Sequence, residues 1–172
     1  MDETTRAYVA GFFDGEGSIT LGYGSSDYLG KEGLRRNYYP RIQIVIASSD
    51  ENILIKIRQF LGMGHIYKTK PRGVSRKEMN YLRITNMAEV HKTMEEILTY
   101  LIVKKEQALL CKETSETLIK LKKPTAKNAN WSNENLLYFN EQIKKIYAIK
   151  TSFGSLQKRK LVVNGEVCLP TL

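Results

Sequence analysis

Residues 8–20 read YVAGFFDGEGSIT, and no other stretch of the chain is as informative. An apolar helical run that contains the small residues Ala10 and Gly11 ends there in two acids, Asp14 and Glu16. Because the C-terminus of a helix carries partial negative charge, acids at that end are unfavourable by about 0.3–1 kcal/mol. A divalent cation held by the hard carboxylate oxygens would offset that cost. The small residues would also let a second backbone approach this helix closely.

The nine residues from Val9 to Gly17 resemble, position by position, the signature of the LAGLIDADG homing endonucleases. Phe12 and Phe13 fill its apolar positions, and Glu16 stands for its second acid, so the character of the residues is kept. The alternative is an ordinary amphipathic helix with a glycine-rich C-cap and solvated acids. That alternative explains the glycines but not two acids at the unfavourable end of a helix.

Length and composition agree with a nucleic-acid-binding domain. The chain has 172 residues, 42% of them hydrophobic, which is enough for one domain with an ordinary core. Its net charge of +9 implies a polyanionic partner. Cys111 and Cys168 lie far apart without the spacing of metal ligands. Neither a signal-peptide pattern nor an apolar run of about 18 residues is found, so we expect an intracellular protein without a membrane partner.

The hydrophobic pattern predicts an α+β fold with an antiparallel sheet built from two hairpins. A helix over residues 4–14, capped by Thr4 or Thr5, opens the chain. The other predicted elements are strands 18–23 and 38–47 joined by a long loop over 24–37, a helix to about residue 61, strands 65–69 and 80–85 joined by a basic loop over 70–77, and helices 87–99, 104–122 and 132–149. The order α-β-β-α-β-β-α with extra C-terminal helices matches the fold that the resemblance implies.

The C-terminal residues predict a small β-hairpin. Asn164-Gly165 separates two short apolar runs, which is a strong signal for a type I′ turn. A lone hairpin is marginal in water, so we expect it to pack on the body or on DNA. A disordered basic tail is the alternative. We therefore divide the chain into an endonuclease domain over 1–155 and a basic tail over 156–172.

The resemblance implies a site for Mg²⁺, or another divalent cation such as Mn²⁺, with Ca²⁺ as a non-catalytic substitute. Glu16 corresponds to the acid that binds the cation, and the backbone carbonyl of Gly15 to a further ligand. Asp14 corresponds to an acid that caps the partner helix at the dimer seam, with only secondary metal contact. Hydrolysis of a phosphodiester needs an activated water and positive charge near the phosphate.

Two further catalytic candidates come from the same resemblance. Residues 103–108 are similar to a family stretch in which a lysine points at the active site, and Lys104 takes its place, with Lys105 as the neighbouring alternative. Both lysines could instead lie on a solvated helix start. Ser48 or Ser49 stands where many relatives carry a glutamine that orients water, although either could be only a helix N-cap.

Strand alternation predicts a DNA-reading stripe opposite the isoleucines of residues 42–46. A β-ribbon fits the major groove, where Arg and Gln pair with guanine and adenine. The predicted reading residues are Tyr39, Arg41, Gln43, Tyr67, Thr69, Tyr81 and Arg83. The predicted phosphate contacts are Lys31, Arg35, Arg36, Arg72 and Lys77.

A single copy of the signature implies a homodimer about the first helix. The expected interface residues are Ala7, Ala10, Gly11 and Asp14. We therefore expect a metal-dependent enzyme that cuts both strands of a long pseudo-palindromic DNA site. The alternatives are an RNA maturase that binds intron RNA and a non-cleaving DNA-binding regulator. The retained Glu16 and Lys104 favour the enzyme, because pure binders need not keep them.

Overall fold

The computed structural model describes residues 1–30, 33–69, 78–121, 131–151, 161–163 and 166–168. In chain order, its elements are α1 (Glu3–Glu16), β1 (Gly17–Gly30), β2 (Gly33–Ser48), α2 (Glu51–Leu61), β3 (His65–Thr69), β4 (Met79–Ile84), α3 (Met87–Ile97), the 3₁₀ turn η1 (Leu98–Tyr100), α4 (Lys105–Lys120), α5 (Asn133–Thr151), β5 (Leu161–Val163) and β6 (Glu166–Cys168). This order confirms the predicted α-β-β-α-β-β-α core with additional C-terminal elements.

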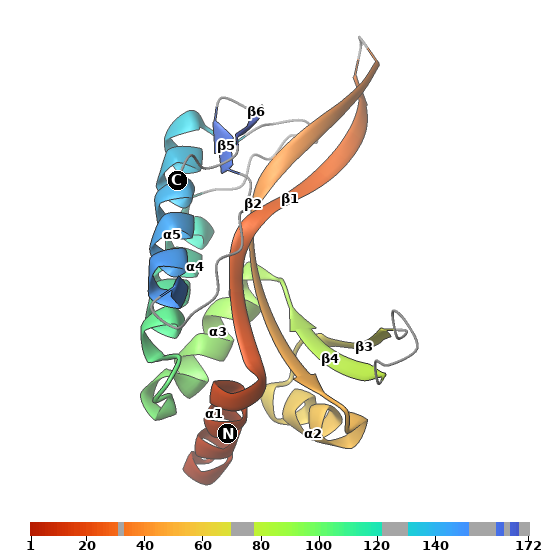
Figure 1. Ribbon diagram of the computed structural model, residues 1–172, viewed down its shortest axis with the longest axis vertical. Coiled ribbons are helices and arrows are strands. Elements are labelled where there is room, and N and C mark those ends of the chain that lie inside the picture. Colours follow the sequence, from red (N-terminus) through yellow and green to blue (C-terminus); the bar gives the residue numbers. More distant parts are fainter. Residues whose placement is uncertain (31–32, 70–77, 122–130, 152–160, 164–165, 169–172) are drawn as a thin grey trace.

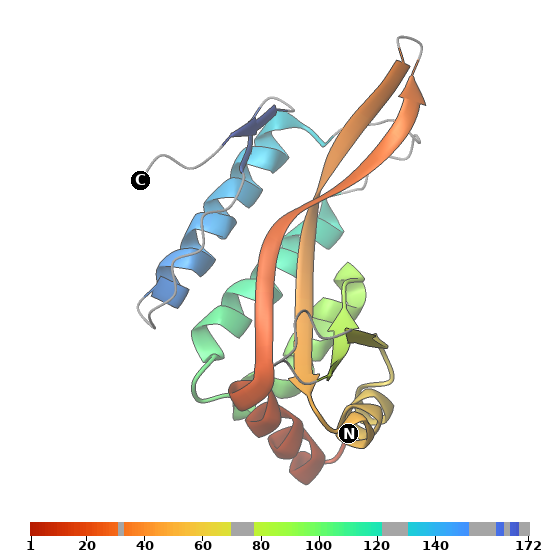
Figure 2. The same ribbon diagram turned by 45° about the vertical axis from the view of Figure 1, so that its right-hand side comes forward.

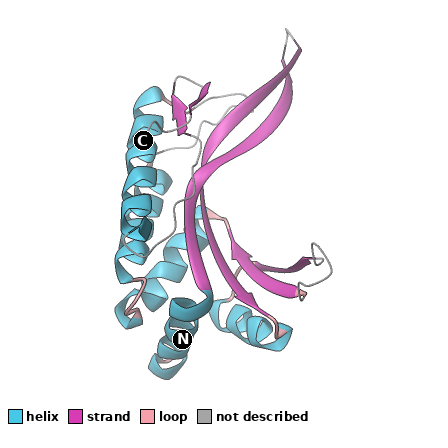
Figure 3. Ribbon diagram, in the orientation of Figure 1, coloured by secondary structure: helices cyan, strands magenta, loops and turns pink. Residues whose placement is uncertain are grey.

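A four-stranded antiparallel sheet, ordered β1-β2-β4-β3, forms the centre of the fold. Helices α3, α4 and α5 lie on one side of this sheet, and its other side is curved and carries none of the described helices (Figures 1 and 3). The isoleucines of residues 42–46 are buried on the helical side, as predicted. Val9, Ala10 and Phe13 of α1 join the same core. We call the uncovered side the open face.

The first hairpin is much longer than the sequence pattern predicts. Residues 24–37 were expected to form a loop, but β1 and β2 stay paired as far as Gly30 and Gly33. Figures 1 and 2 both show this hairpin extending past the rest of the sheet. Its glycines, serines and charges have low strand propensity, but cross-strand contacts compensate. One of them is an ion pair between Asp27 and Arg36, with 2.6 Å between Oδ1 and Nε.

Helix α1 begins earlier and ends later than predicted. Its N-cap is Asp2, whose Oδ1 accepts the Thr5 N–H at 2.8 Å, so the predicted threonine caps are wrong. The helix continues to Glu16, and Gly17 is extended with φ −82°. A Cβ at Gly17 would lie 2.3 Å from Cδ2 of the Phe13 ring. Glycine is therefore required there by close packing.

Helix α5 is fixed to the first strand by Tyr23. The hydroxyl of the half-buried Tyr23 donates to Asn140 Oδ1 at 2.8 Å, and its ring meets Phe139 edge-on at 5.3 Å. Burial raises the pKa of this phenol well above its ordinary value. Within the described ranges, no helix has the length and apolar character needed to cross a membrane.

The predicted C-terminal hairpin is present. Strands β5 and β6 pair in antiparallel register, with Leu161 opposite Cys168 and Val163 opposite Glu166. The Asn164-Gly165 turn lies outside the described residues. Strand β5 lies against α5 and β1, so the hairpin packs on the body of the fold.

Candidate active site and nucleic-acid interface

Asp14 joins the end of α1 to the start of α4. Its Oδ2 accepts the backbone N–H groups of Ile102 at 2.7 Å and Val103 at 3.1 Å, and its Oδ1 accepts that of Lys104 at 2.9 Å. Burial raises the pKa of this carboxyl, but the three N–H donors and the Lys104 charge outweigh burial, so the pKa lies below its ordinary value. Asp14 was expected to cap the partner's helix, and in this structure it binds the segment that leads into α4 of its own chain.

Lys104 is turned toward the C-terminus of α1. Its ammonium donates to the backbone carbonyl of Phe13 at 3.2 Å and also to that of Asp14. These carbonyls carry the partial negative charge of the helix end. Burial lowers the pKa of Lys104 more than the nearby carboxylates of Asp14 and Glu16 raise it. Lys105 is exposed, so the structure brings Lys104, rather than Lys105, to the acidic end of α1.

Glu16 is the exposed last residue of α1. In the described part of the chain, no hydrogen bond or ion pair engages its carboxylate, and Lys104 is its electrostatic neighbour. Gly15 beside it is also exposed, with no heavy atom within 4 Å of where a Cβ would stand. The described residues form no cluster of three or more His, Cys, Asp or Glu side chains that could hold a metal. One chain therefore offers a single free carboxylate at this point.

Ser48 lies at the end of β2 and forms part of a turn. Its Oγ accepts the backbone N–H of Asp50 at 3.1 Å, and Asp50 is the N-cap of α2. The predicted alternative of a serine N-cap is therefore wrong. Among the described residues, no hydrogen bond links Ser48 to Glu16 or Lys104.

Asn80 was missed by the sequence analysis. Its Nδ2 donates to the carbonyls of Ser48 at 3.4 Å and Ser49 at 3.1 Å, which holds the turn after β2 in place. Asn80 is buried and shares the core side of β4 with Leu82 and Ile84. A polar residue at a core-side position of a strand was the signal that could have identified it.

The strand register places every predicted reading residue on the open face. Arg83 lies opposite Val45 on one side and His65 on the other, and Tyr81 likewise lies between Ala47 and Tyr67. Thr69 follows at the end of β3, and Tyr39, Arg41 and Gln43 continue the same face along β2. The register adds His65, Ser18 and Thr20, which the sequence analysis did not select.

Tyr39 lies flat against the neighbouring strand. A Cβ at its cross-strand partner Gly24 would come within 2.5 Å of the Tyr39 ring, so the ring covers the bare backbone of Gly24. Tyr39 is 39% exposed, so part of the residue remains accessible from solvent. Arg41 is paired with Gly22 and meets no side chain from β1 at its cross-strand position.

Of the predicted phosphate contacts, the structure describes Arg35 and Arg36, both in β2. Arg36 lies on the side of the hairpin opposite the open face, where its ion pair with Asp27 raises the pKa of the guanidinium. Arg35 pairs with Tyr28 in the strand register of the same hairpin. Lys31, Arg72 and Lys77 lie outside the described residues.

The exposed side of α1 differs from the predicted interface at one position. Ala7 and Gly11 are exposed, and nothing lies within 4 Å of a Cβ placed at Gly11. Ala10 is fully buried in the core of its own chain, so its assignment to an interface is wrong. Tyr8 is exposed beside the same small residues and packs against Phe12, with ring centres 6.4 Å apart.

Comparisons with known proteins agree with this arrangement. Residues 9–114 match the family model described as LAGLIDADG endonuclease. A comparison with curated proteins found no match. Among solved structures, the homing endonuclease I-CvuI in complex with its target has a TM-score of 0.63 at 23% identity, over 85% of this chain and 82% of that chain.

Two other solved structures are also similar. The homing endonuclease I-TnaI has a TM-score of 0.61 at 19% identity, over 86% of this chain and 95% of that chain. The LAGLIDADG meganuclease I-AabMI bound to uncleaved DNA has a TM-score of 0.53 at 22% identity, over 88% of this chain and 46% of that chain. At these identities the likeness shows a shared fold, and the family model spans more than half of the chain. The protein therefore belongs to the LAGLIDADG endonuclease family.

Proposed function

We propose that this protein is a homodimeric, site-specific DNA endonuclease that uses a divalent cation to hydrolyse both strands of a long pseudo-palindromic site. The observation that carries the proposal is the junction of α1 and β1. Glu16 ends the helix as an exposed carboxylate, and Ser18, two residues later, begins the open face of the sheet. The acid that would bind the cation thus lies at the edge of the surface that would bind DNA.

The residues at this junction fit a hard cation such as Mg²⁺. Glu16 supplies a carboxylate with no competing partner among the described residues, and the carbonyl of Gly15 is a second hard oxygen. When bound, the cation would activate water and stabilise the charge that develops on the phosphate. One protein carboxylate leaves ligand positions for DNA phosphates and a second subunit. I-CvuI was crystallised on DNA with calcium and on uncleaved DNA with magnesium, which supports a divalent cation here.

Lys104 and Asp14 prepare this junction for catalysis. The Lys104 ammonium binds two carbonyls at the end of α1, so it fixes the residues immediately before Glu16. It also places a positive charge near Glu16, where negative charge would develop on the phosphate during the reaction. Asp14 holds the start of α4, and with it Lys104, against α1.

The exposed side of α1 is suited to meet a second copy of the chain. Ala7 and Gly11 project little from the helix, so two helix backbones could approach closely across a two-fold axis. The same contact would bring two Glu16 carboxylates to one place. A two-fold dimer would present two open faces to DNA, which explains why the site should be pseudo-palindromic.

A selection from random DNA tests the proposal. The protein is incubated with a randomised duplex library, once with Mg²⁺ and once with a chelator, and both cut ends and bound duplexes are sequenced. We expect cut ends only with Mg²⁺, in one enriched sequence with approximate two-fold symmetry. Enriched binding without cutting under either condition would support a DNA-binding regulator. No enriched DNA, together with selective binding of folded intron RNA, would support a maturase.

A further inference from the structure

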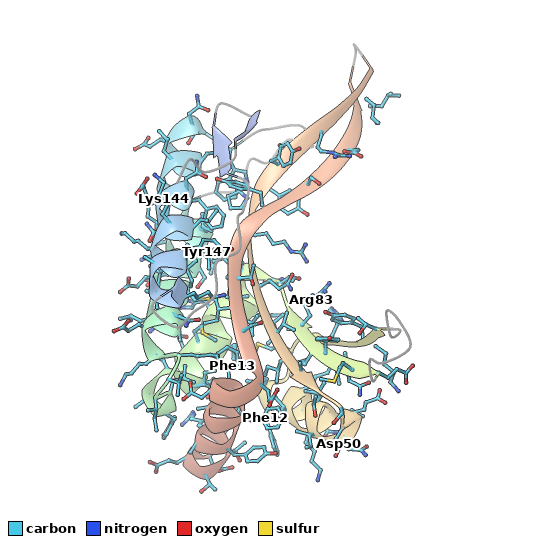
Figure 4. All side chains as sticks on the ribbon, in the orientation of Figure 1. Phe12, Phe13, Asp50, Arg83, Lys144 and Tyr147 are labelled. Carbon is cyan, nitrogen blue, oxygen red and sulfur yellow. The ribbon has the colours of Figure 1, made fainter. Side chains whose placement is uncertain are left out.

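Tyr67, Tyr81 and Arg83 form a prearranged stack on the open face of β3 and β4. The two tyrosine rings stack at 5.2 Å with an interplanar angle of 18°. The Arg83 guanidinium lies 4.3 Å from the centre of the Tyr67 ring, and its Nη2 donates to the Tyr67 hydroxyl at 2.6 Å. Figure 4 shows Arg83 on the side of the sheet away from α3–α5. The long Arg83 side chain, which would otherwise be flexible, is therefore held in one orientation.

The donors that remain on Arg83 determine what it can bind. Nε is buried and has no partner among the described residues, so a ligand cannot reach it. One Nη2 proton is used by Tyr67. Each terminal nitrogen therefore keeps at least one N–H for a ligand, and a fork of one N–H from each nitrogen matches the two acceptors O6 and N7 that guanine presents in the major groove.

The register also indicates where this fork would meet DNA. Arg83 lies in the same cross-strand row as Val45 and Ser18. Ser18 follows Glu16 by only two residues, so this row is the part of the open face next to the proposed cation site. Tyr39 and Gly24 lie six rows farther along the hairpin. Arg83 would therefore contact a base pair in the inner part of each half-site.

We propose that Tyr67 is the positioning residue that makes Arg83 a guanine reader at one inner base pair of each half-site. The proposal rests on the proposed function, because it requires sequence-specific DNA binding. Tyr67 acts through Arg83: its ring and its hydroxyl fix the guanidinium before DNA arrives, which avoids the entropy cost of ordering that side chain on binding.

The test compares base preferences of four variants. Tyr67→Phe removes the acceptor hydroxyl but keeps the ring. Tyr138→Phe is the matched control, since Tyr138 lies in α5 on the other side of the sheet. Arg83→Ala and the double variant Tyr67→Phe/Arg83→Ala complete a thermodynamic cycle. The selected site of the wild type is changed one base pair at a time, and binding of each DNA is measured in Ca²⁺. Thermal unfolding of the variants checks that they fold.

We expect the wild type to prefer guanine at one inner base pair by about 5- to 150-fold, the range for one bidentate contact. Arg83→Ala should lose that preference alone. Tyr67→Phe should lower it by about 2- to 10-fold, the factor that one hydrogen bond carries, and should have no effect when Arg83 is already alanine. Tyr138→Phe should leave it unchanged.

Three results would overturn the inference. The first is that Tyr67→Phe weakens binding to all base pairs equally, and the second is that it leaves every base preference unchanged. The third is that it sharpens the guanine preference, because Tyr67 would then hold Arg83 away from DNA. A wild-type protein that selects no DNA site would remove the proposed function together with this inference. A selected site with an unchanged Tyr67→Phe profile would remove the inference alone.

Discussion

At the scale of single residues, Asp14 and Glu16 have different roles although they lie two positions apart. Asp14 is engaged by three backbone N–H groups, whereas Glu16 is exposed and free of described partners. Glu16→Gln keeps the shape and removes the charge that a cation needs. We expect DNA cleavage to be abolished and binding of the target to be retained, as measured by cutting and by gel shift. Glu3→Gln, at the other end of α1, is the control. Appreciable Mg²⁺-dependent cutting by Glu16→Gln would place the metal on another acid.

Asp14 should contribute chiefly to stability. Asp14→Asn removes the charge that accepts three backbone N–H donors, so we expect the free energy of unfolding to fall by about 1–2 kcal/mol at neutral pH, measured by urea denaturation. The folded pKa of Asp14 is lowered, so its contribution is complete above the unfolded-state pKa and is lost as the pH falls through the folded pKa. The difference between wild type and variant should therefore shrink in acid. A difference that grows in acid would contradict this role.

At the scale of elements, the step from α1 into β1 depends on Gly17. A Cβ there would lie 2.3 Å from the Phe13 ring, while a Cβ at Gly15 meets no heavy atom within 4 Å. We expect Gly17→Ala to destabilise the protein by about 1–3 kcal/mol through overpacking. Gly15→Ala, inside the helix, should be neutral or stabilise by up to about 1 kcal/mol. Thermal unfolding of the pair measures this, and equal effects would show that the Phe13 contact is unimportant.

The sequence predicted the elements better than their ends and their contacts. The isoleucine alternation of residues 42–46 identified β2 and its open face, because the two-residue period of a half-buried strand can be read directly from the sequence. The paired strands over 24–37 were missed, because their stability comes from partners across the hairpin, such as Asp27 with Arg36. The contact of Asp14 with the segment before α4 was missed for the same reason, because it joins residues about 90 positions apart.

The candidate site was predictable to a similar degree. The acids stood out because their position at a helix C-terminus conflicts with the helix dipole. Lys104 followed only from the family resemblance, and its contact with the α1 carbonyls is visible only in three dimensions. The burial of Ala10 was missed, because a helix sequence does not say which of its sides meets the core.

At the scale of the whole molecule, the exposed small residues of α1 should govern the proposed dimerisation. Gly11→Leu would add a large side chain where two helix backbones should meet, so we expect the dimer to dissociate and cleavage to be lost. Light scattering measures the mass. A Cβ at position 11 would meet nothing within 4 Å beyond its own helix backbone. The variant should therefore keep its fold, which circular dichroism checks. A Gly11→Leu protein that remains a cleaving dimer would contradict the interface.

The position of β1 at the edge of the sheet has a consequence for solubility. An edge strand offers unpaired backbone groups to strands of other molecules, which promotes aggregation. Helix α5 covers part of this edge, because Lys150 donates to the backbone carbonyl of Ile19. The contacts of Tyr23 with Asn140 and Phe139 hold the helix beside the strand. Shortening the protein before α5 should therefore give a chain that self-associates through β1, and a minimal nuclease built on this scaffold would need α5 or a substitute shield.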